Sequence, residues 1–181
     1  MTHHLLRDTR AHVGGLVLAA LTLAASGGAA QDPGGPDSHP PARLRAADAK
    51  AAALLAAGKA RSATFRELLQ AIEHSDLMVH VDTRSFLKVP GQLQLLAATP
   101  GCRHVRVSVR TPGLDNDLVA WLAHELTHAV EVATAPEVRD QAGLRRLYQR
   151  IGRTGRYGDD AESAAAQEIW TKVLGEMRAA R

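Results

Sequence analysis

The spacing of apolar residues along the chain changes from a helical period to a strand period and back again. Apolar residues recur every three to four positions in 42–57 and again in 64–74, which predicts two helices. From Leu77 the period becomes two, since Leu77, Val79 and Val81 stand at alternate positions. A half-buried strand has this pattern, so a strand is expected to begin at Leu77.

A β-hairpin is predicted to follow that strand. Residues 93–98 form its first strand, and the turn residues 99–101 (Thr-Pro-Gly) lead into a second, in which Val105, Val107 and Val109 alternate with polar residues. We expect the polar side chains of this last strand, including its arginines, to be solvated. If the strand is instead an open edge of the sheet, it can pair with an extended substrate through main-chain hydrogen bonds.

Helical periodicity returns after the hairpin and continues, with interruptions, towards the end of the chain. The predicted helices and their end signals are 118–133, capped by Asp115 or Asn116 and ended by Pro136; 137–151, stopped by Gly152; and a last helix, capped by Asp159 or Asp160, that runs to about Ala179. Helices around a short antiparallel sheet make an α+β fold, which is the predicted class.

The helix 118–133 carries the pattern His124-Glu125-Leu-Thr-His128, an HExxH motif. Its apolar residues gather on one side of the helix, and the two histidines lie nearly opposite them. Histidines four positions apart stand one above the other on a helix, so their imidazole nitrogens can converge on one Zn²⁺. Glu125 lies beside that face, where it can take a proton from a zinc-activated water.

A catalytic zinc site needs a third protein ligand, and Glu162 fits this role best. In the predicted last helix, Glu162 lies on the apolar stripe close to the helix start. A carboxylate that points into a core is costly unless it is paired or bound to a metal ion. The competing interpretation is that Glu162 is an acid favoured near a helix N-terminus by the helix dipole.

Other acids remain open as ligands. Glu131 shares the histidine face, but it is better placed to orient His128 through a hydrogen bond. Asp159 and Asp160 are further candidates for the third ligand, because the helix boundary is uncertain by a few residues. The motif does not continue as in the metzincins, whose glycine and third histidine would fall at Glu131 and Thr134.

The motif helix, a preceding sheet and a downstream helix that offers Glu162 together resemble a gluzincin-type zinc metallopeptidase core, the thermolysin-like arrangement. Residues 93–177 are also similar to small secreted bacterial HExxH proteins of uncharacterised function. The resemblance implies zinc on His124, His128 and Glu162. The chain departs from the thermolysin-like pattern at Ala166, where that pattern has an aspartate that orients a histidine.

A tyrosine is expected to assist the reaction. Tyr157 precedes the predicted third-ligand helix and can donate a hydrogen bond to the oxyanion of a peptide undergoing hydrolysis. Tyr148 is the other candidate, although packing in the core is the commoner role for a tyrosine at its position.

The N-terminus predicts export. Residues 1–30 have two arginines, an apolar run too short to span a bilayer and small residues at the end, as in a signal peptide. Residues 31–41 are rich in proline and glycine, which predicts a flexible linker, and 42–181 form the expected zincin-like domain. A periplasmic or extracellular protein is expected, with no stable membrane span after cleavage.

Composition narrows the expected partners. The formal charge of +3 comes from dispersed arginines with no interleaved aromatic residues, so no nucleic-acid partner is expected. Cys102 is the single cysteine of the chain, which excludes an intramolecular disulfide and predicts a small buried apolar side chain.

The sequence therefore predicts an exported zinc metallopeptidase with Zn²⁺ as cofactor, peptides or proteins as substrates and Glu125 as general base. The competing hypothesis is a non-catalytic module, in which zinc ties two helices together or the ligand face binds a partner.

Overall fold

The computed structural model describes residues 42–155 and 158–180, all of them within the unit His39–Arg181. The predicted signal peptide (1–30) and linker (31–41) lie outside the described residues. The described part is α+β, with five helices, a four-stranded mixed sheet and a two-stranded hairpin. In chain order the elements are β1 (Leu44–Ala46), α1 (Ala49–Arg61), α2 (Ala63–Glu73), β2 (Leu77–Arg84), β3 (Gly91–Thr99), β4 (Cys102–Arg110), α3 (Asp115–Ala133), α4 (Gln141–Ile151), β5 (Gly152–Gly155), β6 (Gly158–Ser163) and α5 (Ala164–Ala179).

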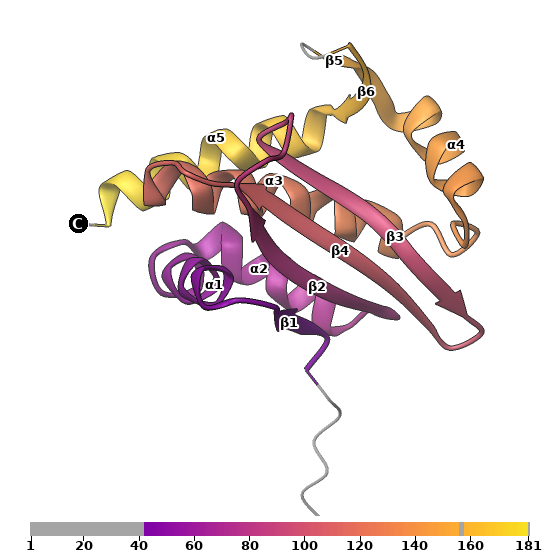
Figure 1. The fold of residues 1–181 in the computed structure, drawn as a ribbon, viewed down its shortest axis with the longest axis horizontal. Coiled ribbons are helices and arrows are strands. Elements are labelled where there is room, and N and C mark those ends of the chain that lie inside the picture. The colour runs from indigo at the N-terminus through magenta and orange to yellow at the C-terminus, as the bar shows by residue number, and fades with distance from the viewer. Residues whose placement is uncertain (1–41, 156–157, 181) are drawn as a thin grey trace, which may run out of the picture. The chain divides into compact units, whose positions relative to one another are not determined.

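The main sheet has the strand order β1-β2-β4-β3, so β4 lies inside it and β3 forms one edge (Figure 1). Within this sheet only the β3–β4 pair is antiparallel; β2 pairs in parallel with both β1 and β4. The expectation of an antiparallel sheet is therefore wrong, because β3 lies outside β4 and brings β4 back beside β2 in the same direction. The suggestion that β4 is a substrate-binding edge is wrong for the same reason.

Helix α3 lies between the sheet and α5, while α1 and α2 cover the β1–β2 end of the same sheet face (Figure 1). Since α3 has neighbours on both sides, it is buried around most of its circumference, including Leu122, Leu126 and the motif residues. The core consists largely of the inward valines of the strands packed on α3, among them Val105, Val107 and Val109. The HExxH residues are thus anchored in the most buried helix of the fold.

Two predicted helix starts differ from the structure. Residues 44–46 form β1, and α1 begins only at Ala49, behind Asp48, whose carboxylate accepts a hydrogen bond from the Ala51 amide at 2.8 Å. Asp115 is the first residue of α3 and not its cap; it contacts Lys50 at 2.5 Å. A three-residue strand beside an alanine-rich helix cannot be recognised from apolar spacing, because alanine fits both the helical and the strand period.

The last helix also starts later than predicted. Residues 158–163, with Asp159 and Asp160, form β6, which pairs with β5 in a register that sets Glu162 opposite Arg153. Helix α5 begins at Ala164, and Ser163 caps it by accepting a hydrogen bond from the Ala166 amide at 3.0 Å. Glu162 therefore lies in a strand just before the helix, and the expectation that the third-ligand candidate belongs to the helix is wrong.

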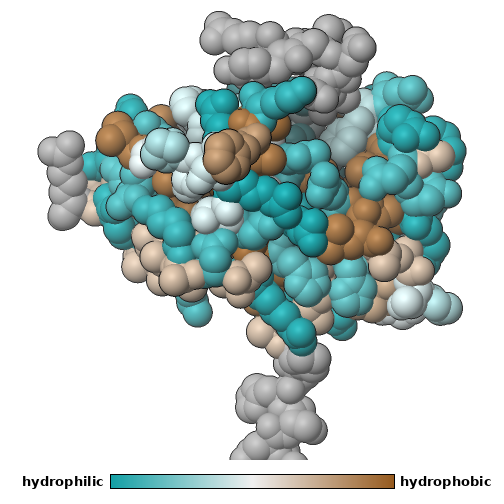
Figure 2. Space-filling model, in the orientation of Figure 1, coloured by the Kyte–Doolittle hydropathy of each residue, from teal (hydrophilic) through white to brown (hydrophobic). Residues whose placement is uncertain are grey.

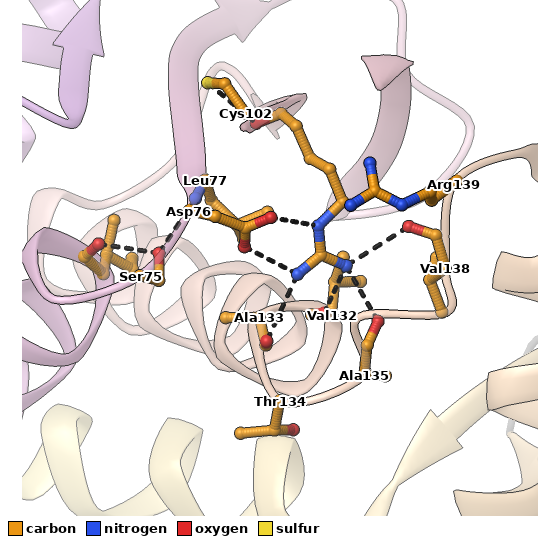
Figure 3. A network of polar contacts seen from close by, with 12 residues as sticks. Ser75, Asp76, Leu77, Cys102, Val132, Ala133, Thr134, Ala135, Val138 and Arg139 are labelled. Carbon is orange, nitrogen blue, oxygen red and sulfur yellow. Dashed lines mark hydrogen bonds and ion pairs between the residues drawn. The ribbon is translucent and has the colours of Figure 1, made fainter. Parts of the chain in front are cut away.

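The C-terminal end of α3 is held by a fully buried arginine. Arg103 is on the same side of β4 as the core valines, and its guanidinium forms two hydrogen bonds of 2.7–2.8 Å with the carboxylate of Asp76. It also donates to carbonyl oxygens of the last turn of α3 and of the segment that follows it (Figure 3), namely those of Val132, Ala133, Ala135 and Val138. The last carbonyl groups of a helix have no donor within the helix, and the Arg103 guanidinium donates hydrogen bonds to them. The same side chain joins α3 to the start of β2.

The outer face of the sheet is largely hydrophilic (Figure 2). On it, His80 Nε2 lies 3.3 Å from His104 Nδ1, and Cys102 Sγ lies 3.8 Å from His104 Nε2. Cys102 is partly exposed, so the expectation of a buried cysteine is wrong. Its position at the first residue of β4, where the strand leaves the turn, accounts for this exposure.

Candidate active site

Helix α3 brings the two motif histidines face to face. His124 Nε2 lies 3.2 Å from His128 Nε2, and the rings meet edge to face with centroids 4.8 Å apart. Both residues are buried, with 1% and 7% of their surface exposed. Two ligands about 2.0–2.1 Å from one tetrahedral zinc are about 3.3–3.4 Å apart, so the nitrogens have the spacing that a shared metal ion requires.

Glu162 approaches this pair from β6. Its Oε2 lies 3.7 Å from His124 Nε2, and its side chain is 23% exposed. Gln167 on the first turns of α5 donates a hydrogen bond to the same oxygen. Among the described residues, no group of three or more His, Cys, Asp and Glu side chains is arranged to hold a metal ion. The geometry is that of two close pairs that share His124, and not of a closed three-ligand set.

Glu131 contacts His128 from the next turn of α3. His128 Nδ1 and Glu131 Oε2 are 2.8 Å apart, with Nδ1–H donating. In a neutral His128 this bond would leave Nε2 unprotonated and facing His124, which is how Glu131 would orient a metal ligand. Burial opposes charge on His128, but the carboxylates of Glu131, Glu125 and Glu162 outweigh it and raise the pKa of this histidine.

His124 has no comparable partner. Its Nδ1 is buried and forms no hydrogen bond of good geometry to a described residue, although the Ala166 backbone lies close enough to affect the pKa of the ring. Burial, together with the nearby His128, lowers the pKa of His124 to about 4, so the ring is neutral at pH 7. The thermolysin-like pattern would orient a histidine with an aspartate at position 166, and no acid does so for His124 among the described residues: Glu131 contacts His128, and Asp115 contacts Lys50.

Glu125 is 5% exposed, and burial raises the pKa of its carboxyl to about 7. The backbone of β3 lies directly against it. A Cβ added to Gly91 would fall 2.5 Å from Glu125 Oε1 and 2.6 Å from its Cγ, which is closer than real atoms approach. Only glycine at the first residue of β3 allows the carboxylate its present position, and no local sequence pattern marks this residue.

Tyr148 on α4 packs edge-on against His128, with ring centroids 5.2 Å apart. Its hydroxyl is buried and forms no hydrogen bond to a described residue. Burial, with the nearby Glu131 and Glu125 charges, raises the pKa of this phenol, so it stays protonated as a donor. Tyr157, the tyrosine preferred in the sequence analysis, lies outside the described residues.

A cavity of about 680 Å³ opens beside these groups. One part of its wall is the loop between β2 and β3, and another is the face of α4 that carries Leu144, Arg145, Tyr148 and Gln149. Trp121, His124, Glu125, His128 and Glu162 complete the side nearest to α3. The cavity therefore gives a ligand access to both histidines and to the carboxylate of Glu125.

No helix among the described residues is long and apolar enough to cross a membrane. Comparisons of the chain with protein-family models, with curated proteins and with solved structures give no match.

Proposed function

We propose that this protein is a zinc-dependent peptide hydrolase of the zincin type, exported from the cell that makes it. The observation that carries the proposal is the 3.2 Å separation of His124 Nε2 and His128 Nε2 beside the carboxylate of Glu125 in an accessible cavity. Glu162 Oε2, 3.7 Å from His124, is the third ligand that we favour. Two imidazole nitrogens and one carboxylate oxygen are a common donor set of catalytic zinc.

Each side chain of the site has a separate role in the proposed reaction. When bound, zinc would lower the pKa of a water molecule and polarise the peptide carbonyl. Glu125 accepts the proton of the attacking water on its carboxylate and passes it to the leaving amine. Tyr148, and Tyr157 as first predicted, are the candidates for donating a hydrogen bond to the developing oxyanion. Glu131 keeps the His128 ring in its orientation.

A structural zinc site is the second candidate function. The deep burial of the motif histidines favours it. Glu162 comes from a different segment, so a metal ion held by all three residues would join α3 to the β6–α5 corner. In that case Glu125 would have no chemical role, and peptide hydrolysis would be absent at full zinc loading.

Metal content tests the ligand assignment. We expect His124→Ala and His128→Ala to abolish stoichiometric zinc, because each removes one of few protein ligands. Glu162→Gln should also lose zinc, whereas Glu131→Gln should weaken binding by about 10- to 100-fold, as expected for a residue that only orients a ligand. Zinc affinity measured by competition with a chelator distinguishes these cases.

Glu168→Gln is the matched control for Glu162→Gln, since Glu168 is an exposed acid on α5 away from the site. If Glu131→Gln empties the site while Glu162→Gln leaves it full, the third ligand is Glu131 and not Glu162.

Gly91→Ala should impair the reaction without removing zinc. The new methyl group forces the Glu125 carboxylate to move, and a displacement of about 1 Å already costs on the order of 10²-fold in rate. We expect kcat to fall with little change in KM and with the zinc content of the wild type. Gly101→Ala is the control, because a Cβ there meets no atom within 4 Å. Equal rates for both variants would show that the contact at Gly91 does not position the base.

A further inference from the structure

The cavity carries two basic side chains that the proposed reaction does not use. Lys88 lies in the loop between β2 and β3, and Arg145 lies on α4; both are exposed and both line the cavity. No described acidic side chain is within ion-pair distance of either of them. Their charges therefore face the cavity without a neutralising partner in the described part of the chain.

The acidic side chains of the lining are already engaged. Glu125 and Glu162 are the carboxylates among the described lining residues, and both belong to the candidate reaction centre. A divalent ion held there would cancel their two negative charges. Among the described lining residues, the basic side chains then leave an excess of positive charge.

The apolar part of the cavity wall strengthens the electric field of these basic side chains. Apolar and aromatic side chains line much of the cavity, including Trp121, Leu144 and Phe86, which is 97% exposed at the rim. Walls of low dielectric constant focus the field of nearby charges into a cleft and raise the local concentration of ions of opposite sign. An anionic group on the substrate is therefore favoured over a neutral or cationic one.

We propose that this cavity selects peptides that present a carboxylate close to the scissile bond, with Arg145 as the main recognition residue and Lys88 as a second cation. The planar guanidinium of an arginine can bind a carboxylate through two parallel hydrogen bonds. An Asp or Glu side chain and a C-terminal carboxylate offer the same chemistry. This inference rests on the peptide hydrolysis proposed above.

The test uses the full chain loaded with zinc and short labelled peptides that differ only in one group. One series exchanges Glu for Gln at each position of a peptide with an amidated C-terminus; a second keeps Gln and frees the C-terminal carboxylate. Binding is measured by fluorescence anisotropy with the Glu125→Gln variant, and hydrolysis is measured with the wild type. The two series separate a side-chain carboxylate from a terminal one.

We expect one carboxylate position to tighten binding by about 2- to 5-fold at low salt, the usual range for a partly exposed ion pair, and to lose this advantage at high salt. Arg145→Glu should abolish or reverse the preference, and Lys88→Glu should reduce it. Arg146→Glu makes the same change in net charge at the next residue of α4, which is exposed and outside the cavity lining, and should keep the preference.

Three outcomes would overturn the inference: no difference between the Glu and Gln peptides, a preference that survives Arg145→Glu, or equal loss in Arg145→Glu and Arg146→Glu. In each case hydrolysis by the wild type can persist, so the proposed function would stand. Conversely, a carboxylate preference in binding without any hydrolysis would support the selective cavity and contradict the peptidase.

Discussion

Glu125→Gln should retain the full zinc content of the wild type and lose about 10²- to 10⁴-fold of its peptide hydrolysis. Glu125 lines the same cavity as the two histidines and is not one of the proposed ligands, so glutamine keeps the shape of the site and removes only the base. The expected loss is the usual contribution of a positioned general base. Metal analysis and digestion of a diverse peptide library by the two proteins measure both quantities.

Glu125→Asp provides a second test of the same role. Its shorter side chain withdraws the carboxylate by more than about 1 Å, so we expect a loss on the order of 10²-fold with zinc unchanged. The opposite result is a zinc-loaded wild type that hydrolyses no peptide and does not differ from Glu125→Gln. The structural zinc site would then be the better description of the motif.

The second large effect is expected at Asp76, on the stability of the fold. Asp76→Asn removes the counter-charge of Arg103, whose side chain is fully buried. An uncompensated buried charge typically costs about 3–5 kcal/mol, and the remaining carbonyl acceptors place the expected loss near the lower value. Urea unfolding followed by circular dichroism measures it. Asp115→Asn, at an exposed ion pair, should change the free energy of unfolding by less than about 1 kcal/mol.

The contribution of Asp76 should depend on pH. The hydrogen bonds and charge of Arg103 hold the pKa of Asp76 below its ordinary value, so the folded state binds its proton less readily than the unfolded state does. The stabilisation is therefore complete above the unfolded pKa of about 3.9 and is lost as the pH falls through the folded pKa. The difference in unfolding free energy between wild type and Asp76→Asn should shrink below about pH 4; a constant difference would exclude this origin.

Much of the secondary structure follows from apolar spacing, and the pairing of the strands does not. The period of two from Leu77 and the alternate valines of 105–109 correctly predict β2 and β4, and the turn at 99–101 predicts β3, the hairpin partner of β4. Spacing shows which face of a strand is buried but not its neighbours. The mixed sheet depends on β3 lying outside β4, and no local pattern encodes that choice.

Some residues of the candidate site can be predicted from sequence, and others cannot. The two histidines could be placed together from sequence because one helix carries both. Glu162 is predicted near them because a buried carboxylate is costly without a partner. It does lie near His124, but in β6 and not in the last helix, because pairing with β5 keeps the chain extended there. Gly91 and Arg103 depend on contacts between distant segments. Arg103 did leave a signal, since it shares the alternation of Val105, Val107 and Val109.

Helix α3 places its polar motif where a protein of this size would ordinarily keep apolar side chains. His124 Nδ1 is buried without a well-formed hydrogen bond to any residue that the structure describes, and Glu125 is almost completely shielded from water. Each of these groups lowers the stability of the metal-free fold, since burying a polar atom without a hydrogen bond is unfavourable. Leucine or methionine at these positions would make the empty protein more stable, but they would remove the groups that the proposed reaction needs. Zinc bound as proposed would stabilise only the folded state, and it would so return part of the stability that the motif costs.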